Sequence, residues 1–338
     1  MPVRWGIVTA AKICHDFVNA FNSYPAKKDA VIAAVAARDK SKATEFAKLH
    51  NIPKVFGSYK EMAESKDIDV AYIGSLNPQH YELTKLFLEN GKHVLCEKPL
   101  CMNSKQVQSL VNLARKKKLF LMEAIWSRFA PAYIALEKEI QAGKLGELQY
   151  VEVNYGLPIS EIARLSKKEL GGSAIMDLGI YALQFAQYIF KDEPLKCTAV
   201  GNLNDDGVDE VDTVILEYSG GRRAVLNIHA KARLWNKATV YGTAGRASIE
   251  EPFHFPESMV HVDGTVEKFP LHSSKIYYNF DNSAGLVYEA LEVTRCIQQG
   301  LLESPRMPLS DSITISKLQD SVRRQVGVVY DADSQEFP

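Results

Sequence analysis

Lys98, in the triplet Glu97-Lys98-Pro99, stands where a side chain could do chemistry. It follows a strand expected over residues 93–96 and precedes a proline, which is not the setting of a typical surface lysine. Burial would lower the pKa of such an amine, and a nearby carboxylate would raise it again. In either state the amine can hold a substrate hydroxyl by a hydrogen bond or relay a proton. We therefore expect Lys98 to be catalytic and Glu97 to lie beside a bound cofactor.

The loop after the first expected strand has the position of a dinucleotide-binding turn but lacks its glycines. The pattern G-x-G-x-x-G would fall on Thr9, Ala11 and Cys14. A helix N-terminus needs only a close approach of its backbone to bind a pyrophosphate, and alanine is the next smallest residue. An ordinary strand–helix turn without a ligand is the alternative. The residues of this turn expected to contact a cofactor are Thr9, Ala11, Lys12 and Ile13.

Arg38 follows the second expected strand, with Asp39, Ser41 and Lys42 close behind. An NAD enzyme places a carboxylate at this strand tip for the ribose 2′-hydroxyl, whereas a guanidinium suits a 2′-phosphate. Arg38 and Ser41 therefore favour NADP(H) as the cofactor, and Asp39 is the residue that argues for NAD(H). A solvated charged loop is the alternative interpretation.

A third candidate segment is the turn Ser75-Leu76-Asn77-Pro78-Gln79-His80, after the fourth expected strand. Its proline stiffens a turn at the carboxyl edge of the sheet, where ligands bind in such folds. We expect cofactor contacts from Ser75, Asn77 and His80. Capping of the following helix is the alternative for His80.

The first third of the chain alternates strand-like and helix-like segments. Apolar runs at 3–9, 30–37, 70–74 and 93–96 have the length and composition of buried strands, and helical segments separate them. This alternation predicts an α/β domain with a doubly wound parallel sheet, a Rossmann domain over residues 1–125.

Residues 126–338 follow a different pattern. Period-two segments alternate with one long apolar helix over about 173–190, and two helices near 284–299 and 311–327 close the chain. This pattern predicts an α+β domain with a mostly antiparallel open sheet, for substrate binding and dimerisation. The polar tail from Asp331 onward is expected to be loosely held. The apolar strand residues expected to leave a partner surface are Val214, Leu216, Val225, Leu226 and Ile228.

Composition excludes several classes of function. The 338 residues carry 40 Lys and Arg and 41 Asp and Glu, a net charge of −1, which gives no support to a nucleic-acid partner. No segment approaches the roughly 20 apolar residues of a membrane span, and no signal peptide is recognisable. The five cysteines are scattered and the eight histidines lack ligand spacing, so neither a disulfide framework nor a metal site is indicated. We expect a cytoplasmic protein without metal, membrane or nucleic-acid partner.

Three motifs in combination resemble the Gfo/Idh/MocA oxidoreductase family. They are the Glu97-Lys98-Pro99 triplet, the turn at 75–80 and the run from Ser127 to Tyr133. Segments 123–129, 171–181 and 279–282 resemble the dimeric dihydrodiol dehydrogenases of this family, also described as NADP-dependent D-xylose 1-dehydrogenases. The resemblance spans nearly the whole chain, although residues 157–170 match weakly.

The resemblance implies a site and a reaction. Lys98 falls on the family's lysine, and Tyr181 stands where many relatives have a histidine. Asp177 lies four residues before Tyr181, so both share one helix face. The substrate would be a trans-dihydrodiol or an aldose of the D-xylose type, and NADP⁺ would accept the hydride. Tyr181 would accept the proton, with its pKa lowered by the Lys98 ammonium.

The resemblance also implies aromatic walls for the substrate, from Trp126, Tyr155 and Phe280, although core packing is the commoner fate of aromatic residues. Arg128 is expected to fix the cofactor or the Trp126 loop. A homodimer packed sheet to sheet is expected. Two other functions stay open. One is reduction of a keto-sugar such as an anhydrofructose, and the other is NADP sensing by a regulator without chemistry. Retention of both Lys98 and Tyr181 speaks against the regulator.

Overall fold

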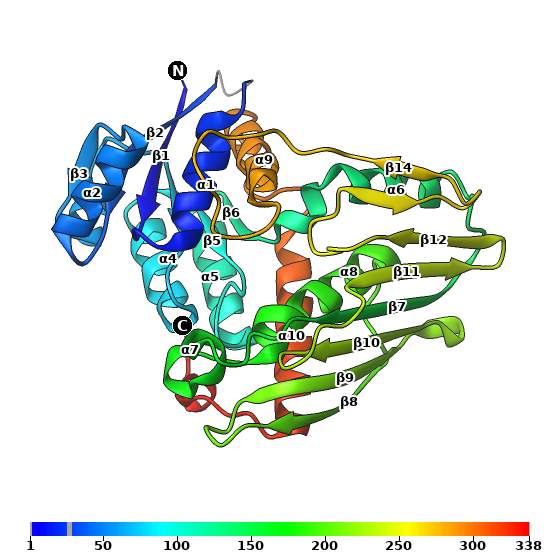
Figure 1. The fold of residues 1–338 in the computed structure, drawn as a ribbon. Helices are drawn as coiled ribbons and strands as arrows, with labels where there is room; N and C mark the ends of the chain where they lie inside the picture. The colour runs from blue at the N-terminus through cyan, green and yellow to red at the C-terminus, as the bar shows by residue number, and fades with distance from the viewer. Residues whose placement is uncertain (1, 26–28, 338) are drawn as a thin grey trace.

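The computed structural model describes residues 2–25 and 29–337 of the chain. Its first sheet has six parallel strands in the order β3-β2-β1-β4-β5-β6 (Figure 1). The order reverses between β1 and β4, and ligands of such sheets bind at the carboxyl ends of these strands. The expected doubly wound Rossmann sheet is confirmed. Its strands are β1 (Val3–Val8), β2 (Ala30–Ala36), β3 (Lys54–Phe56), β4 (Val70–Ile73), β5 (His93–Glu97) and β6 (Leu121–Ala124).

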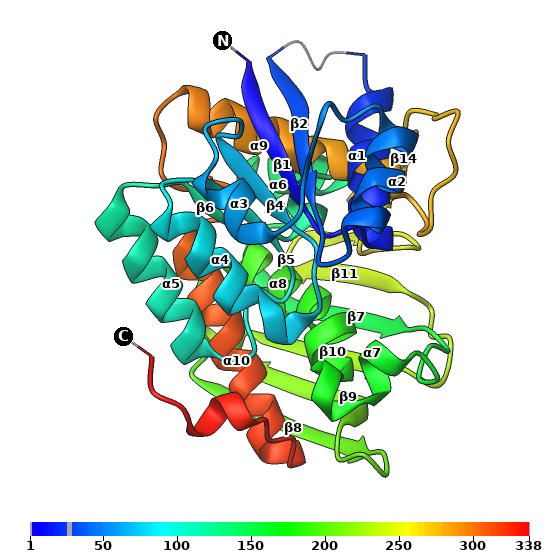
Figure 2. The ribbon, with the colours of Figure 1, turned by 90° about the vertical axis from the view of Figure 1, so that its left-hand side faces the viewer.

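Helices cover both faces of this sheet (Figure 2). On one face α1 packs with Trp5 and Phe17 in the main core, and on the other face α4 and α5 form a second core around Phe87 and Leu110. Burial on both faces explains why the strands read as continuous apolar runs. The helical segments of this half are α1 (Lys12–Ser23), α2 (Lys40–His50), α3 (Tyr59–Glu64), η1 (Asn77–Gln79), α4 (His80–Glu89) and α5 (Ser104–Lys117).

The second sheet has eight strands in the order β14-β13-β12-β11-β7-β10-β9-β8. Its pairs are antiparallel except for β7 and β10, so the mostly antiparallel sheet is confirmed. The short strands β13 and β14 form a hairpin at one edge of this sheet. The strands are β7 (Leu148–Gly156), β8 (Lys196–Leu203), β9 (Asp209–Glu217), β10 (Arg223–His229), β11 (Lys237–Gly242), β12 (Gly245–Ile249), β13 (Ser258–Val260) and β14 (Val266–Lys268).

Two C-terminal helices join the halves of the molecule. Helix α9 packs on α1, and α10 packs on both α5 and α8 (Figure 1). No helix among the described residues is long and apolar enough to cross a membrane. The remaining helical segments are η2 (Trp126–Phe129), α6 (Pro131–Gln141), α7 (Ala163–Ser166), η3 (Lys168–Leu170), the π-helical turn η4 (Ile175–Gly179), α8 (Ile180–Phe190), η5 (Ser219–Gly221), η6 (Ser283–Gly285), α9 (Leu286–Gln298), α10 (Leu309–Val326) and η7 (Asp331–Ser334).

The open face of the second sheet is not the one expected. Four of the five residues predicted to form a partner surface are buried in the main core, namely Val214, Leu216, Leu226 and Ile228. Side chains alternate between faces along a strand, so the outer face carries their neighbours. Val200 is 67% exposed and Ile215 is 36% exposed on this face, and Val225 is half-buried.

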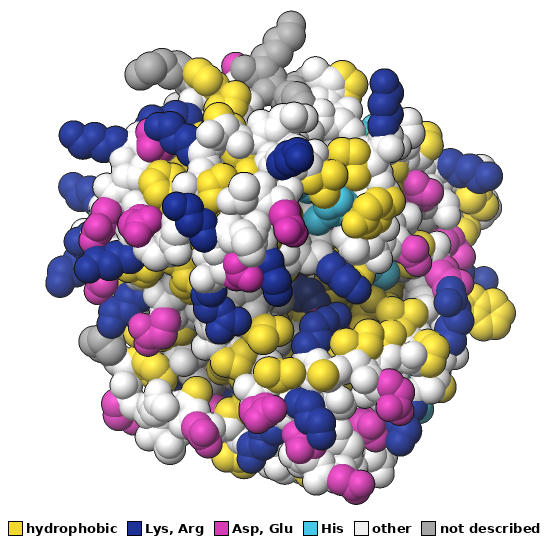
Figure 3. Space-filling model, turned by 60° about the vertical axis from the view of Figure 1, so that its left-hand side comes forward, with side chains coloured by type: hydrophobic (Ala, Val, Ile, Leu, Met, Phe, Trp, Pro, Cys, Tyr) yellow, Lys and Arg dark blue, Asp and Glu magenta, His cyan; other side chains and the backbone are white. Residues whose placement is uncertain are grey.

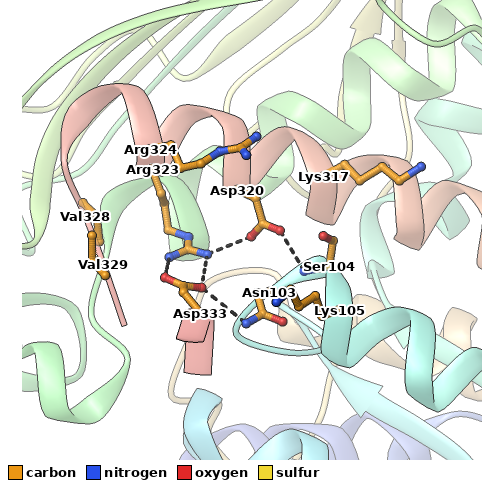
Figure 4. A pocket seen from close by; sticks show the side chains of 10 residues that line it. All are labelled: Asn103, Ser104, Lys105, Lys317, Asp320, Arg323, Arg324, Val328, Val329 and Asp333. Atoms are coloured by element: carbon orange, nitrogen blue, oxygen red, sulfur yellow. Dashed lines mark hydrogen bonds and ion pairs between the residues drawn. The ribbon is translucent and has the colours of Figure 1, made fainter. Parts of the chain in front are cut away.

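The C-terminal tail is docked, which contradicts the expectation of a loose end. Asp333 pairs with the buried Arg323 of α10 at 2.8 Å and accepts a hydrogen bond from Asn103 at 3.3 Å. The hydroxyl of Tyr330 donates to the carbonyl of Gly172 at 2.5 Å. Figure 4 shows Arg323 between Asp320 and Asp333, with Asn103 beside them, in the pocket between α5, α10 and the tail. This polar network clamps the tail to the Rossmann half.

Candidate active site

Two domains contribute an ion cluster at the carboxyl edge of the Rossmann sheet. The ammonium of Lys98, just after β5, lies 2.8 Å from Oδ1 of Asp177 and donates to the Asp177 carbonyl at 2.9 Å. The guanidinium of Arg164, on α7, lies 2.8 Å from the same Oδ1 atom. Burial opposes ionisation of this carboxyl, but the two cations hold the pKa of Asp177 well below its usual range. Asp177 is therefore an ionised acceptor between two donors.

Glu97 supports Lys98 from inside the sheet. Its carboxylate accepts hydrogen bonds from the Tyr72 hydroxyl at 2.5 Å and from the Lys98 amide at 3.3 Å. Burial raises the pKa of Glu97. The Tyr72 ring stacks on Phe17 of α1, with ring centroids 3.7 Å apart. Because these groups belong to β4, β5 and α1, the Rossmann core fixes the strand end that carries Lys98.

Asp177 is presented by the π-helical turn η4 rather than by a regular helix. The amide of Ile175, where this turn begins, donates to the buried carboxylate of Asp209 on β9 at 2.6 Å. A π turn adds a residue to the helical path, and such turns are frequent at functional sites. Asp177 and Tyr181, expected on one helix face, lie in the π turn and in α8, and Lys98 contacts both residues.

Lys98 lies over the ring of Tyr181, with Nζ 4.8 Å from the ring centroid. The Tyr181 hydroxyl accepts a hydrogen bond from Nε1 of Trp126 at 2.9 Å. Burial, followed by the negative charge of Glu97, raises the pKa of Tyr181 well above its usual value. The expectation that Lys98 lowers this pKa is therefore wrong. Tyr181 is therefore a neutral phenol, because burial and the negative charge of Glu97 disfavour its deprotonated form.

Aromatic rings surround Tyr181. Tyr155 at the end of β7 is buried and lies 5.9 Å from the Tyr181 ring, edge to face. His254 lies 5.4 Å from the Tyr181 ring, and burial lowers its pKa to about 3, so it is a neutral imidazole. Trp126 is buried and stacks on Phe255 at 4.4 Å. These rings make the surroundings of the Tyr181 hydroxyl largely apolar.

Phe280 lies elsewhere, on the loop between β14 and η6. It is 41% exposed, and its amide donates to Asp16 of α1 at 2.9 Å. Among the described ring contacts it has none with Trp126, Tyr155 or Tyr181. Phe280 therefore stands beside the start of α1, apart from the aromatic cluster.

The N-terminus of α1 is partly exposed at the carboxyl edge of the Rossmann sheet, directly after β1. Its N-cap residue, Ala11, makes no side-chain capping bond, so the first amides of the helix lack an acceptor from a cap. Thr9, Ala11 and Ile13 are partly exposed and Lys12 is exposed. Free amides and the helix dipole together form an anion site, so this turn fits a dinucleotide pyrophosphate.

Thr9 and Gly74 explain how this turn forms without the glycines of the pattern. Thr9 has a φ of 86°, the left-handed region that favours glycine, and its hydroxyl donates to the Gly74 carbonyl at 2.8 Å. A Cβ atom at Gly74 would stand 2.5 Å from Sγ of Cys14. Gly74, directly after β4, thus leaves the space that the Cys14 side chain of α1 occupies.

Arg38 is exposed at the end of β2, where a 2′-phosphate would lie in this fold. Asp39, the residue that argued for NAD(H), is the N-cap of α2. Its Oδ1 atom accepts hydrogen bonds from the amide and the hydroxyl of Ser41 at 2.9 and 2.6 Å. These bonds lower the pKa of Asp39. The structure therefore gives Asp39 a capping role, and the Ser41 hydroxyl proton is already used by it.

The turn at 75–80 links the domains. Asn77 donates to the Gly171 carbonyl at 3.1 Å, and Ser75 is half-buried. His80 is fully buried, with its ring nitrogens 2.7 Å from the Pro99 carbonyl and 3.1 Å from the Ser75 carbonyl. A ribose contact from His80 is thus contradicted by its burial. Its ring instead braces the loop that follows Lys98.

Arg128 is also placed differently from the expectation. It is 1% exposed and donates to Gln184 of α8 and to the Arg306 carbonyl, both at 3.1 Å. It also forms an ion pair with Asp311 of α10. All these partners lie in the second half, so Arg128 anchors η2 and the Trp126 loop, and a direct cofactor contact is wrong.

Sequence reasoning missed Arg164 and His254. Arg164 lies in a segment without helical or strand periodicity, so no pattern marks it. His254 stands alone between two phenylalanines, and a single histidine without a motif around it does not indicate a functional site. Figure 3 shows a hollow between the upper and lower halves of the molecule, bordered by basic side chains and by apolar surface. The cluster of Lys98, Asp177 and Arg164 occupies the junction of these halves.

Comparison with known proteins agrees with this architecture. Residues 3–125 match the model of an oxidoreductase family with an NAD-binding Rossmann fold, and residues 133–248 match the Gfo/Idh/MocA C-terminal domain. The protein is thus an oxidoreductase with a nicotinamide-dinucleotide domain. The chain belongs to the Gfo/Idh/MocA family, as its motifs indicated.

Full-length relatives sharpen the comparison. The chain is 43% identical to a trans-1,2-dihydrobenzene-1,2-diol dehydrogenase of Danio rerio, covering 99% of this chain and all of the relative. It is 44% identical to the protein of that name from Xenopus laevis, covering 98% of this chain and all of the relative. The fold is similar to a 3-ketoreductase of Actinomadura kijaniata solved with NADP, with a TM-score of 0.79 and 23% identity over 96% of this chain and 98% of the other.

Proposed function

We propose that the protein is an NADP(H)-dependent oxidoreductase that interconverts a secondary alcohol with a neighbouring hydroxyl and the corresponding carbonyl. The substrate class is a trans-dihydrodiol, as the names of the relatives suggest, or an aldose of the D-xylose type. One observation carries the proposal. The Lys98 ammonium of one domain and the Tyr181 phenol of the other lie together at the carboxyl edge of the Rossmann sheet, 4.8 Å from Nζ to ring centroid.

The proton chemistry follows from the state of Tyr181. A buried neutral phenol whose oxygen already accepts a bond from Trp126 keeps its own hydrogen for donation. Tyr181 would give this proton to a substrate carbonyl oxygen, while Lys98 stabilises the negative charge that develops on that oxygen. Asp177 holds the ammonium in place by a carbonyl and a carboxylate contact.

The cofactor would be held by groups of the Rossmann half. The open amides of α1 and the Lys12 side chain fit a pyrophosphate, and the exposed Arg38 fits a 2′-phosphate. Thr9, Ala11, Ile13 and Ser75 are exposed enough to line this path. When bound, the nicotinamide supplies or accepts a hydride at its C4 atom.

The neutral phenol favours the reductive direction. A group that donates a proton assists reduction, whereas oxidation of an alcohol requires the deprotonated tyrosine as base. Reduction of a keto-sugar or an α-hydroxy ketone is therefore the second candidate within the same site. A regulator that only binds NADP(H) would not need a lysine and a phenol brought together in this way.

The test is a turnover assay in both directions. Diols and aldoses are offered with NADP⁺, and hydroxyketones with NADPH, while absorbance of the reduced nicotinamide is followed. Lys98→Met and Tyr181→Phe should each lower the rate by about 10²–10⁴-fold and leave NADPH affinity unchanged. Tight NADPH binding without turnover on the whole panel would contradict the proposal and favour the regulator.

A further inference from the structure

The proposed proton transfer and the proposed cofactor contacts do not involve Arg164. It lies on α7, in the segment between β7 and the turn that carries Asp177. Its side chain is 40% exposed, and Asp177 is its one hydrogen-bond partner among the residues that the structure describes. A guanidinium carries five N–H groups, so the donors that do not bond Asp177 remain available to a ligand.

The arrangement around Asp177 places this guanidinium close to the reacting groups. Lys98 and Arg164 both contact the same oxygen, Oδ1, at 2.8 Å. Their nitrogens can therefore be no farther apart than two such contacts in line. A substrate whose reacting oxygen contacts Lys98 would therefore bring the neighbouring carbon close to Arg164 and Asp177.

Charge decides which chemical group suits this second position. Asp177 shares its single negative charge between Lys98 and Arg164, and a substrate carboxylate or phosphate beside Arg164 would also face the Asp177 carboxylate. A hydroxyl group both donates and accepts, so it can donate to the carboxylate and accept from the guanidinium. Hydrogen bonds to charged partners are the stronger kind.

We propose that Arg164 is a specificity-determining residue that, with Asp177, binds the hydroxyl on the carbon next to the reacting carbon. It selects 1,2-diols and α-hydroxy carbonyls over compounds with a single oxygen. The inference rests on the proposed function, because Lys98 and Tyr181 define where the reacting oxygen lies. The segment 157–170, which contains Arg164, thereby acquires a role in substrate choice.

Binding of two unreacted probes tests the inference without turnover. Calorimetry of the NADPH-saturated protein would compare trans-cyclohexane-1,2-diol with cyclohexanol, which has the same ring and one hydroxyl fewer. Wild-type protein should bind the diol at least about 10-fold more tightly. Arg164→Leu should weaken diol binding by about 10–100-fold and leave cyclohexanol binding unchanged, and Arg164→Lys should recover part of the loss.

Arg295→Leu is the matched control. Arg295 on α9 is 43% exposed and pairs with Glu292 at 2.9 Å, so it resembles Arg164 in exposure and partner. It should affect neither probe. An equal loss for both probes in Arg164→Leu would overturn the inference, because it would show only structural support of Asp177. Wild-type protein that binds the probes equally, or binds neither, would overturn it as well.

The same variants separate this inference from the proposed function. Rates with NADPH would be compared for 2-hydroxycyclohexanone and cyclohexanone. One outcome is that Arg164→Leu no longer prefers the diol in binding, while the wild-type protein turns over none of the compounds. This outcome would support the inference and contradict the proposed hydride transfer. The opposite outcome is turnover of both ketones with the same ratio of rates in the wild type and in Arg164→Leu. It would support the proposed function and contradict the inference.

Discussion

Nε1 of Trp126 donates a hydrogen bond to the hydroxyl of Tyr181 at 2.9 Å. This bond stabilises the deprotonated tyrosine and so lowers its pKa, against burial and the charge of Glu97, which raise it. In the proposed mechanism, Trp126 would act on the reaction through the oxygen of Tyr181. The balance between these effects would set the pH range in which each direction of the reaction runs.

Trp126→Phe should shift the pH dependence of alcohol oxidation. Oxidation requires the tyrosine to lose its proton, so its rate in the wild type should rise with pH from about pH 6 and still be rising at about pH 10, because the pKa of Tyr181 is raised well above its usual value. Removing the indole donor raises the pKa of Tyr181 further and moves this rise to higher pH. Initial rates with NADP⁺ across this range would measure the shift. An unchanged profile would show that Tyr181 does not carry the proton.

Arg38→Ala should weaken NADPH binding by about 10–100-fold and change NADH binding little, because it removes a charge-assisted contact to the 2′-phosphate. Fluorescence titration with both nucleotides measures the difference. Asp39→Ala is the control. It removes the N-cap of α2 and should lower the thermal midpoint without changing the cofactor preference. Equal losses for NADPH and NADH in Arg38→Ala would contradict the 2′-phosphate assignment.

Gly74→Ala should destabilise the Rossmann half by about 1–3 kcal/mol. The added methyl group would stand 2.5 Å from Sγ of Cys14 and 3.0 Å from Cγ2 of Ile13. Cys14→Ala creates room, so the double variant should regain part of the lost stability. Urea unfolding of the two single variants and the double variant gives this coupling. Additive losses would mean that the two positions do not share the space.

His50 should make the protein less stable in mild acid. Burial, and then the neighbouring His15 at 3.1 Å, lower the pKa of His50 to about 4, from an ordinary value of 6.5. As pH falls below 6.5 the unfolded chain binds a proton at His50 that the folded protein does not bind, so stability is lost between pH 6.5 and 4. The loss is about 2 kcal/mol at pH 5. His50→Asn should flatten this part of the profile in urea titrations at pH 7 and pH 5.

A homodimer through the outer face of the second sheet stays a prediction. The face now assigned to it carries Val200, Ile215 and Val225 instead of the core residues first expected. Sedimentation at micromolar concentration should give a dimer. Ile215→Lys should shift the protein toward monomer because it places a charge on that face. A monomeric wild type at that concentration would end the idea.

Much of the Rossmann half follows from local pattern. Buried parallel strands are apolar on both faces, so their runs stand out, and Lys98 is recognisable because a lysine before a proline ends such a run. The second half was harder to predict. The register of β9 and β10 could not be assigned from alternation alone, because half-apolar strands are compatible with either face toward the helices, and Val214 and Leu226 proved to be core.

The candidate site likewise contains features that the sequence could predict and features that it could not. Tyr181 and Asp177 were placed by resemblance, and the structure brings both to Lys98. The protonation state of Tyr181 could not be foreseen, because it depends on burial and on Glu97 from the other domain. Arg128 and His80 carry polar groups typical of sites, but long-range packing directs them into the interior. Arg164 reaches the site only through the path of an irregular segment.

The bond from the Tyr330 hydroxyl to the Gly172 carbonyl connects the last part of the chain to the start of the turn that presents Asp177. Tyr330 thus supports the segment that leads to Asp177, although the two lie far apart in the sequence. Removal of Tyr330 would break this bond and should loosen the segment that leads into the turn carrying Asp177. Changes at the carboxyl end of the chain are therefore expected to act on the ion pair of Asp177 with Lys98.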